Sequence, residues 1–152
     1  SQSIEDAIDR ITPPDRAAGF KYTIGSVKQR RIVNVEVSPR QHIVTEIKGT
    51  DFRANHYIDL NGIEQIIGPS SRLRVKRATS LINGMDTFSN SDILNVLTDQ
   101  QNPEYPIFRT AQPPDDMATL VTCVFDLDTK QLAIYYGHPI KEEEKCSPYS
   151  MR

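Results

Sequence analysis

The sequence is poor in cysteine and lacks any long apolar run. Only two cysteines, Cys123 and Cys146, occur in 152 residues, which is too few for the disulfide framework of a small secreted domain. No stretch approaches the roughly 18 apolar residues that a transmembrane helix needs. No basic segment followed by an apolar core, typical of a secretory signal, opens the chain. We therefore take a reducing, cytoplasmic compartment as the default expectation.

An excess of charge of one sign is also missing. The 18 basic and 20 acidic residues are interspersed and give a net charge of -2. A nucleic-acid-binding domain usually carries a basic patch or a high isoelectric point. The charge pattern therefore argues against nucleic acid as the main partner.

Several common catalytic and metal-binding motifs are absent from the sequence. It contains no glycine-rich phosphate loop, no GxSxG elbow and no HExxH helix. Neither cysteine has a CxxC partner, and Cys123, within an apolar run, is interpreted as a small buried hydrophobe. The three histidines match no compact ligand spacing; they are His42, His56 and His138. We expect neither a metal nor a cofactor.

The pattern of apolar residues predicts one α+β domain spanning residues 1–152. Ser3 is expected to cap a helix that ends at Ile11, before a Thr-Pro-Pro stop. Alternation of β-branched and polar residues then predicts four strands with short hairpin connections, an antiparallel meander. These strands are Gly19–Val27, Arg31–Val37, Ile43–Ile47 and Phe52–Ile58.

Helical spacing replaces strand alternation in the middle of the chain. Ser70 or Ser71 is expected to cap a helix that ends near Gly84. A second, shorter helix is predicted over Asp92–Leu97, with Ile93 among its buried residues. Helices and strands in separate runs favour α+β layers over alternating βαβ units.

A second hairpin is predicted near the end of the sequence. It joins 120–125 to 132–136, and its first strand is apolar almost throughout, so we expect that strand to be central. The proline-rich segment 102–116 is interpreted as a loop, and the charged segment 141–145 as a solvated tail. Cys146, in that tail, is not a candidate nucleophile.

Two residues at the predicted ends of rigid elements are candidates for catalysis. Asn55 would lie at the end of a strand, and Arg72 in the first turn of the following helix. A neutral amide donor and a fixed cation can stabilise an oxyanion or a thiolate. A cation at the start of a helix opposes the helix dipole, so Arg72 requires another reason for its position. The alternatives are an exposed basic helix face for Arg72 and a packed strand end for His56.

Several segments together resemble the linear-amide C–N hydrolases of the N-terminal nucleophile (Ntn) class. The resemblance is to the branch of acyl-coenzyme A:6-aminopenicillanic-acid acyltransferase and carcinine hydrolase-like proteins, with choloylglycine hydrolases as more distant relatives. The resemblance covers nearly the whole chain and rests on the order and spacing of four segments. The matching pieces are the hairpin within 19–37 with its VNVEVSP strand, Ala54-Asn55-His56-Tyr57, Ser70-Ser71-Arg72-Leu73-Arg74 and the closing hairpin within 120–137.

This resemblance implies a fold and a set of site residues. The chain would be the C-terminal part of a four-layer αββα sandwich with antiparallel sheets. Asn55 corresponds to the oxyanion-hole asparagine, and Arg72 to the arginine that favours the thiolate of the nucleophile. His56, Tyr57 and Ser71 would contribute to substrate binding.

The resemblance also implies that the nucleophile is supplied from elsewhere. In the family, self-cleavage frees a cysteine at a new N-terminus, where its own α-amine serves as the base. Neither Cys123 nor Cys146 matches that cysteine. We therefore expect that the nucleophile is carried by a companion chain, which would make the enzyme a heterodimer, or by a missing segment of the same precursor. This chain alone would be inactive.

Two other interpretations stay open from the residues themselves. One is a self-sufficient, non-catalytic α+β binding or scaffold domain, with Asn55-His56-Tyr57 as a structural strand end. The other uses Ser1 as the N-terminal nucleophile, but Ser1 stands two residues before a helix cap, whereas such nucleophiles open a central strand. The sequence does not identify the acyl or amine group of a substrate, or separate hydrolysis from acyl transfer.

Overall fold

The computed structural model describes residues 1–85, 87–140 and 146–150, the last as backbone. It divides into two compact units, Ser1–Ile66 and Ile67–Arg152, each described here by itself. The described residues form helices and small antiparallel sheets. The chain is therefore α+β, as the sequence predicts.

The first unit opens with a helix, α1, over Ile4–Ile11. The Oγ of Ser3 accepts a hydrogen bond from the Asp6 N–H at 3.1 Å. Acidic residues occupy the first turn, where they complement the helix dipole. The predicted cap and the predicted end of this helix are both confirmed.

Three antiparallel strands follow α1 and pair in the order β1-β2-β3. Their bounds agree with the first three predicted strands to within one residue. In the register, Lys21 lies opposite Glu36, and Thr23 and Thr45 lie on either side of Asn34. The strands are β1 (Phe20–Ser26), β2 (Arg31–Val37) and β3 (His42–Glu46).

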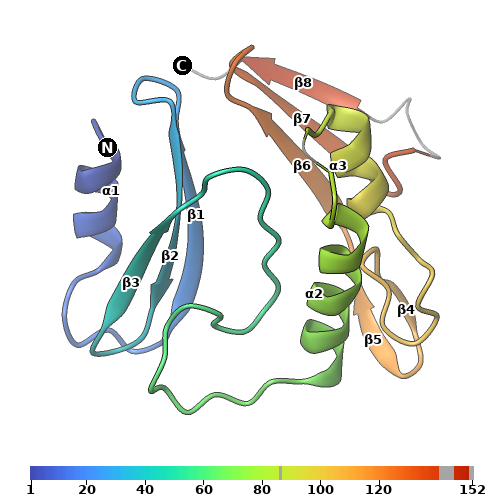
Figure 1. Cartoon of the computed structure of the whole chain (residues 1–152), viewed down its shortest axis with the longest axis horizontal. Coiled ribbons are helices and arrows are strands. Elements are labelled where there is room, and N and C mark those ends of the chain that lie inside the picture. Colours follow the sequence, from blue (N-terminus) through green and yellow to red (C-terminus); the bar gives the residue numbers. More distant parts are fainter. Residues whose placement is uncertain (86, 141–145, 151–152) are drawn as a thin grey trace. The chain divides into compact units, whose positions relative to one another are not determined.

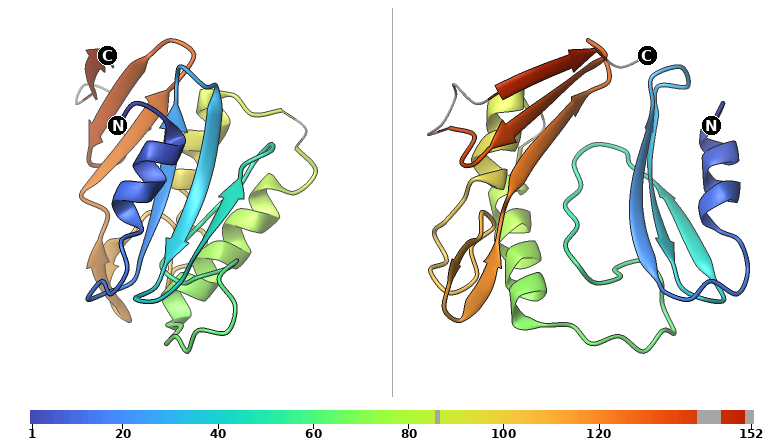
Figure 2. Two further views of the ribbon diagram at one scale, coloured as in Figure 1. Left: turned by 90° about the vertical axis from the view of Figure 1, so that its left-hand side faces the viewer. Right: turned by 180° about the vertical axis from the view of Figure 1, so that it is seen from behind.

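One face of this sheet carries the hydrophobic core of the unit. Val33, Val35 and Val37 alternate along β2 and form a buried cluster with Ile4 of α1. The helix α1 covers this face of the sheet (Figures 1 and 2). All four side chains are at most 1% exposed. Partly buried residues complete the cluster: Ile8, Ile11, Tyr22 and Ile24.

The fourth predicted strand, Phe52–Ile58, is not a strand. This segment is an irregular loop that lies over the sheet face opposite α1 (Figure 1). The backbone N–H of Ile58 donates to the side chain of Glu36 instead of to a neighbouring strand. Tertiary hydrogen bonds to side chains thus replace the ladder that the β-branched and aromatic residues suggested.

The second unit begins with two helices, α2 (Pro69–Ile82) and α3 (Asn90–Leu97). Gly68 occupies the N-cap of α2, and Pro69 opens the helix, so the predicted caps Ser70 and Ser71 are wrong. Ser89 caps α3 in a reciprocal capping box with Asp92.

The buried face of α3 differs from the predicted one. Ile93 is 39% exposed, whereas Val96 is 8% exposed. The helix begins two residues earlier than predicted, at Asn90. The short helix thus exposes one of the apolar residues that helical spacing assigned to its inner face.

A small hairpin replaces the end of the predicted proline-rich loop. It pairs β4 (Thr110–Gln112) with β5 (Asp115–Ala118). The rest of that segment, from 102 to 109, contains no helix or strand, as predicted.

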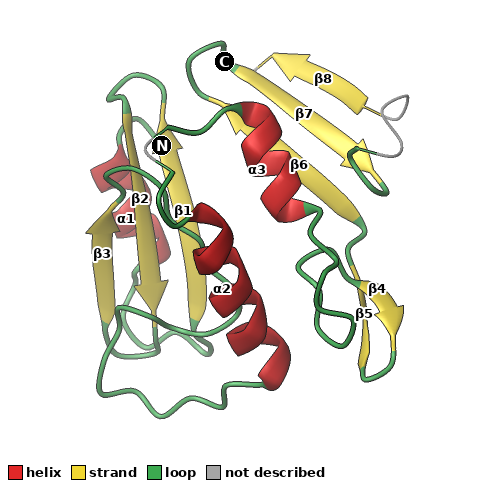
Figure 3. Ribbon diagram, turned by 45° about the vertical axis from the view of Figure 1, so that its right-hand side comes forward, coloured by secondary structure: helices red, strands yellow, loops and turns green. Residues whose placement is uncertain are grey.

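The predicted terminal hairpin is confirmed, but its place in the sheet is not. It consists of β6 (Val121–Asp126) and β7 (Gln131–Tyr136), and β8 (Cys146–Ser150) pairs with β7 (Figure 3). The apolar strand β6 therefore lies at the edge of the described sheet, and β7 is central. Cys123 is exposed instead of buried. The predicted solvated tail, 141–145, lies outside the described residues.

Candidate functional site

Asn55 and His56 form the tip of a loop with two anchored stems, here named stem 51–54 and stem 57–60. Asn55 is exposed, and His56 is partly buried. Asn55 therefore lies in a loop, not at the predicted end of a strand. Contacts on both sides of the tip fix where the loop runs over the sheet.

Stem 51–54 is held by polar side chains of the sheet. The Nζ of Lys21 donates to the carbonyl of Ala54, the residue that precedes Asn55. The amide of Asn34 donates to the carboxylate of Asp51 at 2.5 Å. The backbone entering the tip is thus bonded to β1 and, through Asp51, to β2.

Stem 57–60 has a second set of anchors. The Tyr57 hydroxyl donates to the Val37 carbonyl at 2.7 Å. The Gln65 side chain pairs with the Tyr57 backbone in both directions, accepting from its N–H at 2.8 Å and donating to its carbonyl at 3.0 Å. Burial and the charge of Glu36 raise the pKa of Tyr57, so its hydroxyl is a donor at neutral pH.

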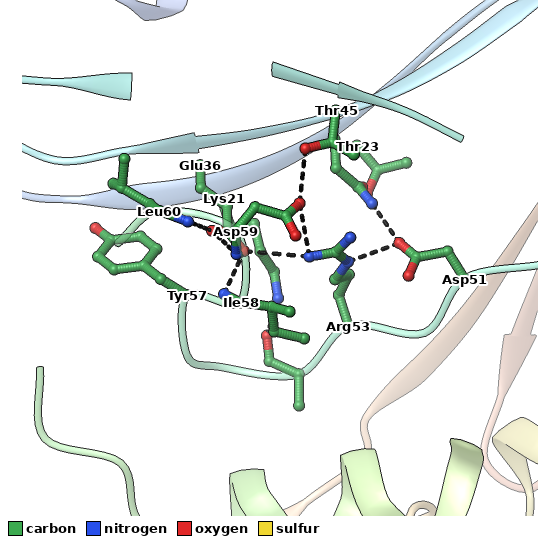
Figure 4. Close-up of polar contacts among 12 residues, drawn as sticks. Lys21, Thr23, Glu36, Thr45, Asp51, Arg53, Tyr57, Ile58, Asp59 and Leu60 are labelled. Carbon is green, nitrogen blue, oxygen red and sulfur yellow. Dashed lines mark hydrogen bonds and ion pairs between the residues drawn. The ribbon is translucent and has the colours of Figure 1, made fainter. Parts of the chain in front are cut away.

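A buried carboxylate connects the loop to the sheet. Glu36 is 1% exposed and accepts backbone N–H groups from Ile58 at 2.8 Å, Asp59 at 2.9 Å and Leu60 at 2.8 Å (Figure 4). Arg53 Nη1 lies 3.5 Å from its Oε1. Burial of an ionised group is tolerated where it is paired and hydrogen-bonded, and Glu36 meets both conditions.

Arg53 links the two stems by charge (Figure 4). Its Nε lies 2.6 Å from Asp51, on its own stem, and its Nη1 lies 3.0 Å from Asp59 on the other. The Thr45 hydroxyl donates to the same Asp59 carboxylate at 2.7 Å. Burial by itself would lower the pKa of Arg53, but these two carboxylates raise it above its usual value. The guanidinium therefore stays charged and connects the two stems by ion pairs.

The other candidates, Ser71 and Arg72, belong to the second unit. Arg72 lies in the first turn of α2, as predicted, and is exposed. Its Nη2 donates to the carbonyl of Ile67, just before the helix, at 3.3 Å. Ser71 is buried, at 6% exposure. The cation at this unfavourable end of the helix dipole thus has a local carbonyl partner.

A second ion-pair cluster lies beside the start of α2. Arg109 donates its Nε to Asp115 at 2.7 Å, and Arg74 donates to the Ser70 hydroxyl at 3.2 Å. Burial and the charge of Arg109 lower the pKa of Arg74. The hydrogen bond from Arg109 lowers the pKa of Asp115. These contacts therefore mainly stabilise the structure around the start of α2.

Two residues that hold this loop, Glu36 and Arg53, were not predicted as site residues from the sequence, although Asn55, His56 and Tyr57 were. A signal was present, because Glu36 and Asn34 alternate with three valines in β2. Such alternation also describes a strand with one solvated face, so sequence alone gave no reason to bury the carboxylate.

None of the helices in the described part of the chain is long and apolar enough to cross a membrane. Among those same residues, no group of three or more His, Cys, Asp or Glu side chains is arranged to hold a metal ion.

Comparison with known families identifies the class of protein. The family model described as acyl-coenzyme A:6-aminopenicillanic acid acyl-transferase matches residues 1–141. The chain therefore belongs to this family, whose fold is that of the Ntn hydrolases and whose chemistry is acyl transfer or amide cleavage. A search of curated proteins finds no match.

Proposed function

We propose that this chain is the part of an Ntn-type amide hydrolase or acyltransferase that provides Asn55 and Arg72 to a cysteine carried elsewhere. The cysteine would open a companion chain, or a segment of the same precursor, after self-cleavage. The observation that carries the proposal is the family match over residues 1–141. Neither Cys123, exposed on an edge strand, nor Cys146, within β8, is assigned as the nucleophile.

The proposed reaction begins with attack of the cysteine thiolate on the carbonyl carbon of a linear amide. The carbonyl oxygen becomes an oxyanion, and the side-chain amide of Asn55 would donate a hydrogen bond to it. Collapse of this intermediate breaks the C–N bond, and the α-ammonium of the cysteine gives its proton to the leaving amine. Water then releases the acyl group as an acid, or a second amine accepts it.

The surroundings of Asn55 support its assignment as the oxyanion donor. An amide donates without changing its own charge, and its loop is anchored on both sides of the exposed tip. An oxyanion hole needs donors whose position is fixed before the reaction. The anchors from Lys21, Gln65 and Tyr57 are the kind of support that such a donor requires.

Arg72 is proposed to favour the thiolate form of the cysteine. It is exposed, and its hydrogen bond to the Ile67 carbonyl at 3.3 Å uses one of the five N–H groups of a guanidinium. A cation near a thiol lowers its pKa. A permanently charged guanidinium would do so across the whole physiological pH range.

Substrate contacts are proposed for His56, Tyr57 and Ser71. His56 follows Asn55 at the loop tip, which supports such a contact. For Tyr57 the role shifts toward positioning, because its hydroxyl is already bonded to Val37. Ser71 is largely buried, so its contribution would come through the start of α2.

The finer description of the fold is part of the same proposal. The β1–β3 and β6–β8 sheets would each belong to a four-layer αββα sandwich. The nucleophile-bearing segment would supply the remaining strands of that sandwich. The strand β6, an edge with exposed Val121 and Phe125, supports the idea that more structure packs there.

The first test is the composition of the purified natural enzyme. Intact mass and N-terminal sequencing under denaturing conditions should find a second chain, or a processed precursor, that begins with cysteine. A folded, monodisperse sample of this chain alone, without thiol-dependent activity, would contradict the proposal and favour a non-catalytic binding domain.

The second test is substitution of Asn55 in the cysteine-bearing enzyme. Asn55→Ala should lower kcat for N-acyl p-nitroanilides by about 10²–10³-fold, the usual loss for one oxyanion donor, with the fold retained. Asn95→Ala, on the exposed side of α3, is the matched control and should keep full activity. An unchanged kcat for Asn55→Ala would exclude Asn55 as the donor. Adding a free amine acceptor to the same assay separates acyl transfer from hydrolysis.

A further inference from the structure

Glu36 contacts both stems of the loop that carries Asn55. Its Oε1 accepts the Ile58 N–H at 2.8 Å and lies 3.5 Å from Arg53 Nη1. Its Oε2 accepts the N–H groups of Asp59 and Leu60 at 2.9 and 2.8 Å. One side chain therefore ties stem 57–60 to β2 by three hydrogen bonds, and also faces the cation of stem 51–54 (Figure 4).

The position of Glu36 in the sheet is itself fixed. It follows Val35 and precedes Val37, both of which are fully buried beneath α1. The strand cannot rotate about its axis without exposing those valines, so the carboxylate must face the loop. The hydrophobic core on one face of β2 thus sets the position of the polar anchor on the other face.

We propose that Glu36 is a positioning residue for Asn55 in amide cleavage or acyl transfer. The proposal rests on the proposed function and adds the group that holds the oxyanion donor in place. Catalytic groups must be held within about 0.5 Å of their productive position by the residues around them. Glu36 does not contact the substrate in this proposal. It acts by fixing the path of the loop backbone that carries Asn55.

A carboxylate is the side chain that this place requires. Three backbone N–H groups donate to it, the cation of Arg53 lies 3.5 Å away, and a carboxylate is an acceptor on both oxygens. In Glu36→Gln, one oxygen becomes an NH₂ group that meets donors, and the charge facing Arg53 is lost. We therefore expect stem 57–60 to move, and the amide of Asn55 with it.

The central experiment is a double-mutant cycle in the cysteine-bearing enzyme. Glu36→Gln should lower kcat by about tenfold or more, since small misplacements of catalytic groups have effects of this size, while KM changes less than about threefold. In an Asn55→Ala background, the same substitution should change kcat by less than about twofold, because the two residues act as one unit.

Two further variants keep the test decisive. Glu36→Asp keeps the charge but is one methylene shorter, and should give a kcat between those of the wild type and Glu36→Gln. If Glu36→Gln does not fold, Glu36→Asp takes its place in the double-mutant cycle. The matched control is Asp99→Asn, which removes the charge of another ion-paired carboxylate, 2.7 Å from Arg77. It should leave kcat unchanged even where it lowers stability.

Hydrogen exchange provides a readout independent of turnover. Amide exchange across 51–60 should accelerate in Glu36→Gln and stay as in the wild type in Asp99→Asn. If Asn55→Ala lowers kcat but Glu36→Gln does not, or if their effects simply multiply, Glu36 has no positioning role. If Asn55→Ala itself leaves kcat unchanged, the proposed function fails first, which is a separate outcome.

Discussion

The contact between Gly19 and Tyr57 allows a quantitative test of how the candidate loop is held. A Cβ atom placed on Gly19 would lie 1.8 Å from the Tyr57 hydroxyl, 2.9 Å from the Val37 carbonyl oxygen and 3.1 Å from the Tyr57 Cζ. The hydroxyl already donates to that carbonyl at 2.7 Å. Gly19→Ala would therefore compete with Tyr57 for the same space.

Both single substitutions should lower the free energy of unfolding. Tyr57→Phe removes one partly buried hydrogen bond, worth about 0.5–1.5 kcal/mol. Gly19→Ala forces a displacement that typically costs about 1–3 kcal/mol. Replacing glycine also restricts the unfolded chain, which offsets about 0.4–1 kcal/mol of that cost. We expect a net loss of about 1–2 kcal/mol for Gly19→Ala.

The double variant isolates the steric conflict. In Gly19→Ala with Tyr57→Phe, the 1.8 Å contact disappears with the hydroxyl, although the contacts with the Val37 carbonyl and with Cζ of the ring remain. Its cost should therefore be smaller than the sum of the single costs by about 0.5–1 kcal/mol, the coupling typical of residues in contact.

Urea unfolding followed by far-UV circular dichroism measures these differences. Changes in the midpoint at constant slope report stability. Tyr136→Phe, a half-exposed tyrosine on β7, is the control and should stay within about 0.5 kcal/mol of the wild type. If the losses in unfolding free energy for Gly19→Ala and Tyr57→Phe are strictly additive, the Tyr57 hydroxyl is not the reason why position 19 requires glycine.

Two other predictions concern the second unit. Ser89→Ala removes the capping box of α3 and should destabilise the protein by about 0.5–2 kcal/mol, seen as a lower urea midpoint; Ser80→Ala, on an exposed helix position, should have little effect. The lowered pKa of Asp115, caused first by its hydrogen bond from Arg109, means that its stabilising effect is present above the carboxyl's unfolded pKa of about 3.9. That stabilisation is lost as the pH falls through the lowered folded pKa. The free energy of unfolding should therefore decline less steeply below about pH 4 in Asp115→Asn than in the wild type. Identical pH profiles for the two proteins would contradict this prediction.

The sequence predicted best where structure depends on near neighbours. The helix Ile4–Ile11 has its cap, its acidic first turn and its apolar stripe within one short segment. The alternation in Arg31–Val37 likewise marks a strand without knowledge of its partners. The family resemblance came from the order of such segments, and the match over residues 1–141 confirms it.

The same reasoning was wrong where side chains from distant segments decide the backbone. Phe52–Ile58 has the composition of a strand, but within the described residues no strand pairs with it. Its last residue, Ile58, and the two residues that follow donate to Glu36, which is more than twenty positions earlier in the chain. No local pattern carries that information.

Tertiary structure alone decided which polar residues became buried. The residue types at 34 and 36 fit a solvated strand face, and only the loop that covers them makes Asn34 and Glu36 about 1% exposed. The sequence thus determined α1 and the strands β1–β3 of the first unit, and the identity of Asn55 as a candidate. The fold determined how the loop of Asn55 is held, because a buried carboxylate is stable only where donors from elsewhere in the chain converge on it.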